Sequence, residues 1–238
     1  MNSDFLIIFE TSVQKIIKRT YNVKSFRFKA PQNFSYKAGQ FFFVRIKING
    51  EEKQKHFSFS SSPTEKGYVE FTKKLTGHEF SNGLDKLKAG DWAELKGPLG
   101  EFTYNEKNRK LVMLTGGIGI TPVRGICRFC TDEYPNTNII LLYGNRTEED
   151  IVFKDDFENM QKQNKNLKVI HTLSEPSENW SGYTGHINKE MLLKEVPDYL
   201  ERNFYSCGPP GLVEAMKKIL TDLAIPKDQI ITENFPGY

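Results

Sequence analysis

The chain has 238 residues, of which 38% are hydrophobic and 26% charged, and its formal net charge is +3. This length can bury a sizeable core in one or two domains, and so mild a charge does not indicate nucleic-acid binding. Three cysteines exclude a four-thiolate zinc or iron–sulfur site within the sequence, and the four histidines show no metal-ligand spacing. The apolar run at residues 5–9 is too short for a signal peptide and no run reaches membrane-spanning length, so a soluble, cytoplasmic protein is expected.

Residues 1–104 show the alternation of apolar and polar side chains that is typical of antiparallel strands. The dipeptide Asn49-Gly50 is a strong hairpin signal between two such runs. One helix is expected near residues 80–87, with Ser81 near its start. The clearest strand signals lie at residues 26–28, 41–48, 68–73 and 92–95. This pattern predicts a small closed antiparallel β-barrel with one helix.

Residues 105–238 alternate short apolar runs with helical patterns, which predicts a doubly wound parallel α/β sheet. The expected strands lie at residues 111–114, 139–143, 168–172 and 204–206. The expected helices lie near residues 123–131, 153–163, 189–196 and 212–223. The polar stretch at residues 104–110 marks the boundary, so we expect two domains, at residues 1–104 and 105–238.

The most informative stretch joins the apolar run at residues 111–114 to a glycine-rich turn. Thr121 is a plausible N-cap of the following helix, and Pro122 suits its first position. The bare N–H groups at the start of a helix bind anions, most commonly phosphate. A strand–turn–helix unit without a ligand is the plain alternative.

Several short motifs follow one another along the chain. They are Tyr36-Lys37-Ala38-Gly39-Gln40-Phe41, Lys55-His56-Phe57-Ser58, Gly77-His78-Glu79-Phe80-Ser81-Asn82, Gly97-Pro98-Leu99-Gly100-Glu101-Phe102, the turn from Gly116 to Pro122, Cys207-Gly208-Pro209-Pro210 and Glu233-Asn234-Phe235. In this order, and over nearly the whole chain, they resemble the ferredoxin–NADP reductase superfamily. The resemblance implies an FAD-binding barrel followed by an NAD(P)-binding domain, without an iron–sulfur domain.

The resemblance also implies a flavin site. Lys55 would face the flavin pyrophosphate, Phe57 would lie against the isoalloxazine ring, and the Ser58 hydroxyl would lie near N5. Lys55 replaces the family's Arg, which removes a bidentate contact to phosphate, and Phe57 replaces a Tyr. The helix start favours FAD over FMN. Further flavin-binding residues would be His56, Thr72, Lys73, Gly77, Phe80, Ser81 and Asn82.

The nicotinamide nucleotide would lie on the second domain. Arg146 could pair with the 2′-phosphate of NADP, whereas the neighbouring carboxylates of residues 148–150 suit the free hydroxyl of NAD, so NADPH is favoured only slightly. Glu233 would orient the reacting rings or relay a proton. The pyrophosphate would be cradled by Gly116, Gly117, Gly119 and Thr121, and Pro122 in the same nucleotide-binding loop would keep it from continuing as a strand. The ribose would lie at Asn145 and Arg146, the nicotinamide at Cys207, Gly208 and Pro209, and Phe235 or Tyr238 would cover the flavin.

By this resemblance the chain is an FAD-dependent NAD(P)H oxidoreductase that passes hydride from nicotinamide to flavin N5 and then single electrons to a separate acceptor. The catalytic residues would be Ser58, Cys207 and Glu233. Residues 1–104 carry 17 Lys+Arg against 11 Asp+Glu, which favours an acidic ferredoxin or flavodoxin as partner, although ordinary scatter of surface charge is an alternative. Other readings are the reductase component of an oxygenase, a ferric-chelate or flavin reductase, and a flavin- or nucleotide-sensing module without turnover.

Overall fold

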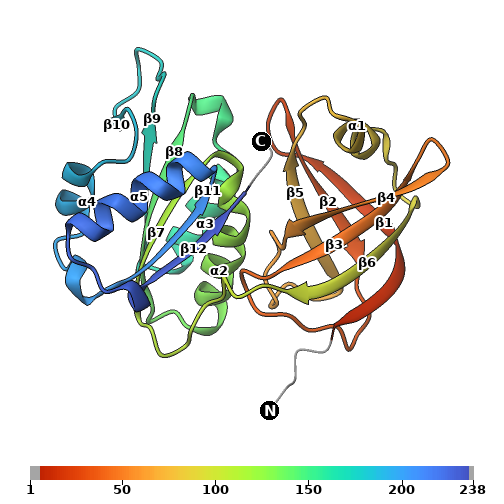
Figure 1. Ribbon diagram of the computed structural model, residues 1–238, viewed down its shortest axis with the longest axis horizontal. Helices are drawn as coiled ribbons and strands as arrows, with labels where there is room; N and C mark the ends of the chain where they lie inside the picture. Colours follow the sequence, from red (N-terminus) through yellow and green to blue (C-terminus); the bar gives the residue numbers. More distant parts are fainter. Residues whose placement is uncertain (1–5, 236–238) are drawn as a thin grey trace.

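The computed structural model describes residues 6–235. An antiparallel β-barrel half and a parallel α/β half lie side by side, with helix α2 (Ile120–Glu133) between them (Figure 1). The expected fold class is confirmed. Within residues 6–235, no helix is long and apolar enough to cross a membrane.

The first half is a six-stranded antiparallel sheet in the order β4-β3-β6-β1-β2-β5 that curls into a barrel (Figure 1). Helix α1 (Glu79–Lys86) follows β5. No ladder joins β4 to β5 within the described part of the chain, so this barrel has an open seam between its edge strands and is not closed as the sequence predicted. The strands are β1 (Ile7–Lys18), β2 (Val23–Lys29), β3 (Phe41–Ile48), β4 (Glu51–Ser58), β5 (Tyr68–Lys74) and β6 (Trp92–Leu99).

Alternation along the strands fills the barrel with aromatic rings. In β3, Phe42, Val44 and Ile46 are fully buried while the residues between them point outward. The rings of Phe57 and Phe71 stack at 4.3 Å, which packs β4 against β5 across the seam. The seam is therefore held by side chains rather than by backbone hydrogen bonds.

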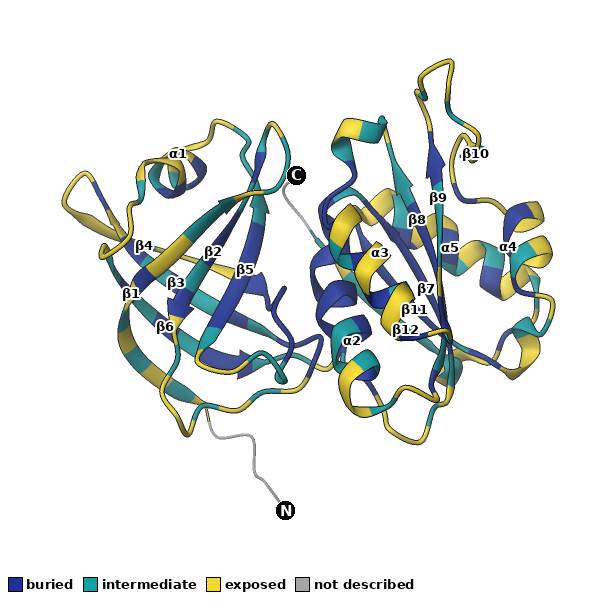
Figure 2. Ribbon diagram, turned by 180° about the vertical axis from the view of Figure 1, so that it is seen from behind, coloured by how far each residue is buried: buried dark blue, intermediate teal, exposed yellow. Residues whose placement is uncertain are grey.

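The second half is a parallel sheet in the order β10-β9-β8-β7-β11-β12. Helices α2 and α3 cover the face toward the barrel, and α4 and α5 cover the other face (Figure 2). Because both faces are covered, β7 is an apolar run without alternation. The strands are β7 (Lys110–Gly116), β8 (Asn138–Asn145), β9 (Leu167–Leu173), β10 (Tyr183–Thr184), β11 (Asn203–Gly208) and β12 (Ile230–Asn234). The remaining helices are α3 (Lys154–Gln163), α4 (Lys189–Glu195), α5 (Pro210–Asp222) and the short η1 (Gly117–Gly119), η2 (Glu148–Asp150), η3 (Tyr199–Glu201) and η4 (Lys227–Gln229).

From β7 the chain continues to β8 on one side of the sheet, and from β11 it continues to β12 on the other side. The strand order therefore reverses between β7 and β11. Ligands of open α/β sheets bind at such a switch point, beyond the carboxyl ends of the strands. The glycine-rich turn begins where β7 ends, and β11 ends at Gly208, directly before Pro209, so both predicted nucleotide motifs meet at this point.

The predicted N-cap of α2, Thr121, is wrong, and Pro122 does not take the first helical position. Helix α2 begins at Ile120 with Gly119 as N-cap, and the Thr121 hydroxyl donates to the Ile118 carbonyl at 3.2 Å. The short helix η1 already starts the helical path, so Pro122 lies in the first turn, where its missing N–H costs nothing. In α1 the N-cap is His78, and the Ser81 hydroxyl instead accepts from the Thr76 N–H at 2.9 Å.

Candidate active site

Two cavities lie at the places where the motifs converge. The first, here called the seam pocket, has a volume of about 470 Å³ and opens at the seam between β4 and β5. The second, the switch-point pocket, has a volume of about 580 Å³ and lies beyond the ends of β7, β8 and β11. The seam pocket is lined by Phe41, Lys55, His56, Phe57, Ser58, Thr72, Lys73, Thr76, His78, Phe80, Ser81, Thr121, Glu233, Asn234 and Phe235.

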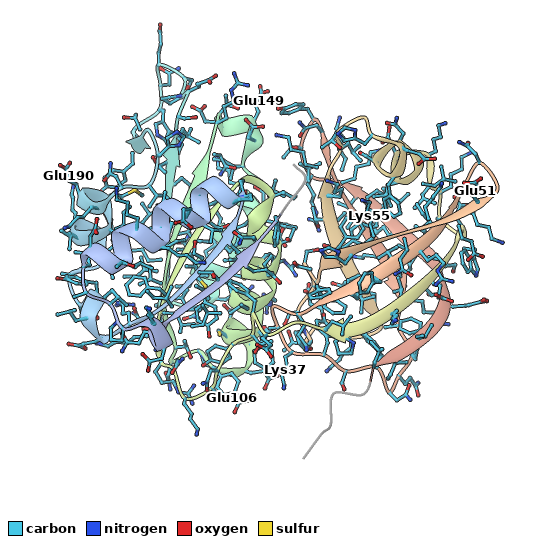
Figure 3. The ribbon with its side chains drawn as sticks, in the orientation of Figure 1. Lys37, Glu51, Lys55, Glu106, Glu149 and Glu190 are labelled. Atoms are coloured by element: carbon cyan, nitrogen blue, oxygen red, sulfur yellow. The ribbon has the colours of Figure 1, made fainter. Side chains whose placement is uncertain are left out.

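One side of the seam pocket is cationic. Lys55 of β4, which Figure 3 labels on the barrel half, and Lys73 of β5 both line it. Burial, with a smaller contribution from the charge of Lys55, lowers the pKa of Lys73 to about 8. The start of α1, with His78 and Ser81, faces the same space. Such a group of cations beside a helix N-terminus suits a phosphate.

The other side of the seam pocket is apolar and ends in a carboxyl group. Phe57 is buried, and its ring lies 6.0 Å from that of Phe80. Glu233 of β12 is half-buried in the same pocket, and burial raises its pKa to about 7, while a hydrogen bond with Ser58 acts in the opposite direction. Its Oε2 atom has no hydrogen-bond partner among residues 6–235.

Cys207 lies on β11 directly beside Glu233 in the parallel ladder. Its side chain is fully buried, its Sγ donates to the Gly119 carbonyl at 3.0 Å, and burial raises the pKa of the thiol. The structure thus brings Ser58, Cys207 and Glu233 together from β4, β11 and β12. They come from opposite ends of the sequence, and β12 was not predicted as a strand.

The glycine-rich turn has a distinct requirement at each glycine. A Cβ at Gly116 would lie 2.6 Å from the Leu212 side chain, and one at Gly119 would lie 2.6 Å from the Cys207 carbonyl. Gly117 has φ +52° and would place its Cβ in open space at the switch-point pocket. The buried Tyr143 hydroxyl donates to the Gly117 carbonyl at 3.0 Å and fixes the turn.

The far rim of the switch-point pocket carries balanced charges. Arg146 is 70% exposed, and its Nε donates to Glu175 at 2.8 Å. Asp150 accepts from the Tyr21 hydroxyl at 2.9 Å, which links this rim to the barrel. Asn145 also lines the pocket. Glu175 neutralises Arg146, so the charges at this rim do not decide between NADH and NADPH, just as the sequence did not.

Most predicted site residues line one of the two pockets, but several lie elsewhere. Thr121 lines the seam pocket and not the switch-point pocket. Gly77 lies beside α1, where its carbonyl accepts from the Asn82 side chain at 2.7 Å, and neither residue lines the seam pocket. Tyr238 lies outside the described residues. The switch-point pocket is lined by Asn22, Val23, Lys74, Gly116, Gly117, Ile118, Gly144, Asn145, Arg146, Asp150, Val152, Ser174, Glu175, Gly185, His186, Ile187, Pro209, Gly211, Leu212, Ala215 and Met216.

The remaining predicted residues pack behind these pockets. Gly119, Pro122 and Cys207 are buried, and Gly208 has φ +142° where β11 ends, so they support the pocket walls from within. The sequence did not reveal the barrel residues Asn22 and Val23 in the switch-point pocket. No local pattern marks them, because they reach the pocket only through the packing of the two halves.

Comparison with known proteins identifies both halves. Family models of an oxidoreductase FAD-binding domain and an oxidoreductase NAD-binding domain match residues 10–104 and 113–218. The chain is 30% identical over 219 residues to NADH-cytochrome b5 reductase 1 of Dictyostelium discoideum, covering 89% of this chain and 77% of that protein. It is 34% identical over 213 residues to the glycine betaine monooxygenase reductase subunit of Pseudomonas aeruginosa (strain UCBPP-PA14), covering 87% of this chain and only 58% of that protein.

A solved structure gives the same fold at lower identity. The ferredoxin NADP⁺ reductase from Neisseria gonorrhoeae with bound FAD and NADP superposes with a TM-score of 0.80 at 21% identity, covering 95% of this chain and 98% of that chain. The predicted boundary between residues 104 and 105 falls in the segment that joins β6 to β7, and its position stays a prediction.

Proposed function

Because this chain belongs to the ferredoxin–NADP reductase superfamily, we propose that it is an FAD-dependent NAD(P)H oxidoreductase that delivers electrons to a separate acceptor. The observation that carries the proposal is that Ser58 and Glu233 line the seam pocket and share a hydrogen bond, while Cys207 lies beside Glu233 in the ladder, near the end of β11 at the switch point. When bound, FAD supplies the chemistry that accepts hydride from a nicotinamide and releases the electrons one at a time.

The described residues fit both cofactors. In the seam pocket, Lys55 and Lys73 suit a pyrophosphate, and the apolar Phe57 suits a flat ring. The buried Oε2 of Glu233, which has no hydrogen-bond partner among residues 6–235, offers a hydrogen-bonding atom to that ring. In the switch-point pocket, the open space at Gly117 lets a ligand approach the backbone as closely as a dinucleotide pyrophosphate requires.

The chain's own residues bind, orient and hold protons. Phe57 excludes water from one side of the seam pocket, and the Ser58 hydroxyl offers a hydrogen bond within it. Burial raises the pKa of Glu233 to about 7, so this carboxyl can hold or release a proton near neutral pH. The Cys207 thiol stays protonated and fills space without charge.

The proposal for the acceptor rests on charge and on the relatives. Residues 1–104 carry 17 Lys+Arg against 11 Asp+Glu, which favours an acidic electron-transfer protein such as a ferredoxin or flavodoxin. An oxygenase component is the second candidate, favoured by the name of the 34%-identical reductase subunit. We place this activity in the cytoplasm, a choice supported by the three free, buried cysteines.

Anaerobic stopped-flow absorbance of the FAD-loaded protein tests the proposal. We mix NADPH and NADH separately with the protein and expect rapid bleaching of the flavin band at about 450 nm. The nucleotide that bleaches it faster is the preferred one. A reduced protein should then pass electrons to an acidic [2Fe–2S] ferredoxin. Bound flavin that neither nucleotide bleaches would overturn the proposal in favour of a sensing module.

A further inference from the structure

Two arginines from different halves of the molecule share one aspartate at the interface. Arg19, between β1 and β2, donates from Nη1 to Asp156 Oδ2 at 3.4 Å, and Arg124 of α2 donates from Nη2 to Asp156 Oδ1 at 2.9 Å. The arginine side chains are only 14% and 6% exposed. Both guanidinium groups lie over the ring of Phe153, at 4.8 and 5.8 Å from its centre.

Each arginine also binds the barrel. Arg124 donates to the Ser60 carbonyl at 3.1 Å and to Glu65 Oε1 at 3.0 Å. Arg19 donates to Glu70 Oε1 at 3.1 Å, and the same oxygen accepts from the Ser60 hydroxyl at 3.1 Å. The segment at residues 60–65, which begins two residues after Ser58, is therefore tied to both arginines.

Arg124 lies on helix α2, so its contacts with Ser60 and Glu65 attach this helix to the barrel. It lies between the parallel sheet and the barrel in both views (Figures 1 and 2) and begins directly after the glycine-rich turn. Its second residue, Thr121, lines the seam pocket, whereas Gly117 and Ile118 just before it line the switch-point pocket. A movement of α2 against residues 60–65 would therefore displace one pocket relative to the other.

The backbone beneath the cluster is itself held in an unfavourable conformation. Phe153 has φ +63°, in the left-handed region that favours glycine, immediately before α3. This conformation places the ring below both guanidinium groups and Asp156 three residues further on. The contacts of the ring with both arginines hold this conformation in place.

We infer that Arg19, Arg124 and Asp156, here called the arginine clasp, are positioning residues that fix the two pockets at the separation needed for transfer between their ligands. None of the three lines the seam or the switch-point pocket. The inference rests on the proposed function. The alternative is that the clasp only stabilises the fold. In that case, weakening any buried ion pair of similar strength should have the same effect on the rate.

The chain offers a matched control for that alternative. Arg202 is also 6% exposed, donates to Asp198 at 2.6 and 3.0 Å, and donates to the Leu111 carbonyl at 3.3 Å. This pair lies within the parallel half, at the opposite end of β7 from the glycine-rich turn. Arg124→Lys and Arg202→Lys each keep the charge and remove the planar fork.

The kinetic arm uses the FAD-loaded variants and stopped-flow reduction by the preferred nucleotide. We expect Arg124→Lys to lower the limiting reduction rate about tenfold or more, because small misplacements of reacting groups have effects of that size. Its nucleotide dissociation constant and flavin content should stay close to wild type, and its long-wavelength charge-transfer absorbance should weaken. Arg202→Lys should retain the wild-type rate. Equal rates in Arg124→Lys and wild type, or equal losses in both variants, would overturn the positioning role.

The structural arm needs no turnover. Amide hydrogen exchange should become faster in residues 60–65 of Arg124→Lys, where the Ser62 N–H donates to Glu65 at 2.7 Å, and should be unchanged there in Arg202→Lys. Unchanged exchange in Arg124→Lys would overturn the clasp, whether or not the wild-type flavin is reduced. A wild-type flavin that neither nucleotide reduces would refute the proposed function alone. If Arg124→Lys does not fold, Asp156→Asn with Asp198→Asn as its control gives the same comparison and the same refuting outcomes.

Discussion

Replacing Glu233 by Gln tests the electrostatics of the seam pocket. Burial raises the pKa of this carboxyl from an ordinary 4.5 to about 7. Each pKa unit corresponds to about 1.4 kcal/mol, so ionised Glu233 costs the folded state up to about 3 kcal/mol. The folded state binds the proton more tightly than the unfolded state does. The cost is therefore absent below the ordinary pKa, grows as the pH rises toward 7, and is complete above it.

Urea unfolding of the flavin-free protein at several pH values measures this effect. At about pH 5 the Gln variant and wild type should differ little, whereas at about pH 8.5 the variant should be more stable by up to about 3 kcal/mol. Glu195→Gln serves as a control of opposite sign. A hydrogen bond with Lys168 lowers the pKa of Glu195, so its variant should lose stability above the ordinary pKa. A constant difference between Glu233→Gln and wild type at every pH would refute the reasoning.

Three further predictions concern the pockets. Glu175→Gln releases the arginine at the rim of the switch-point pocket and should raise kcat/KM for NADPH several-fold over that for NADH, whereas Glu178→Gln on the same loop should not. Lys55→Arg should tighten FAD binding about fivefold, measured by flavin fluorescence, because the guanidinium binds phosphate bidentately. Gly119→Ala should lower the free energy of unfolding by about 2 kcal/mol, because its Cβ would lie 2.6 Å from a backbone carbonyl of β11. Gly211→Ala, whose Cβ would meet no atom of residues 6–235 within 4 Å, should leave stability unchanged or raise it.

Each of these predictions has a result that contradicts it. An unchanged nucleotide ratio in the first variant would show that the released arginine does not reach the nucleotide. Weaker FAD binding in the second would place the flavin phosphates away from this side chain. Equal stability of the two alanine variants would show that the glycine-rich turn can shift to admit a methyl group.

The sequence predicted the alternating elements because apolar periodicity follows directly from burial. The run at residues 111–114 lies in a strand covered on both faces, and Phe42 and Val44 alternate with outward residues as a barrel strand requires. Strand β1 was harder to see, because an irregularity between Val13 and Lys15 shifts its register against β2. Strand β12 has only five residues and lies at the edge of the sheet, so its pattern is weak.

The site was predictable where a motif supplies its own geometry. The residues from Lys55 to Ser58 line one pocket because they lie on one edge strand, and Gly117 faces the other pocket because its positive φ turns the chain there. The placement of Thr121 and the contribution of Asn22 depend on how the halves pack. No local rule encodes that packing, so only the three-dimensional structure reveals it.

The late position of β12 in the chain has a consequence for the order of assembly. Glu233, Asn234 and Phe235 complete the seam pocket, although every other part of its wall except Thr121 comes from the first 81 residues. During synthesis the barrel strands leave the ribosome long before this strand does. Among residues 6–235, β12 is an edge strand whose partner in the sheet is β11, so it needs β11 in place before it can dock. The nascent barrel therefore exposes an incomplete pocket, and a ligand meets the finished wall only after the last strand has docked.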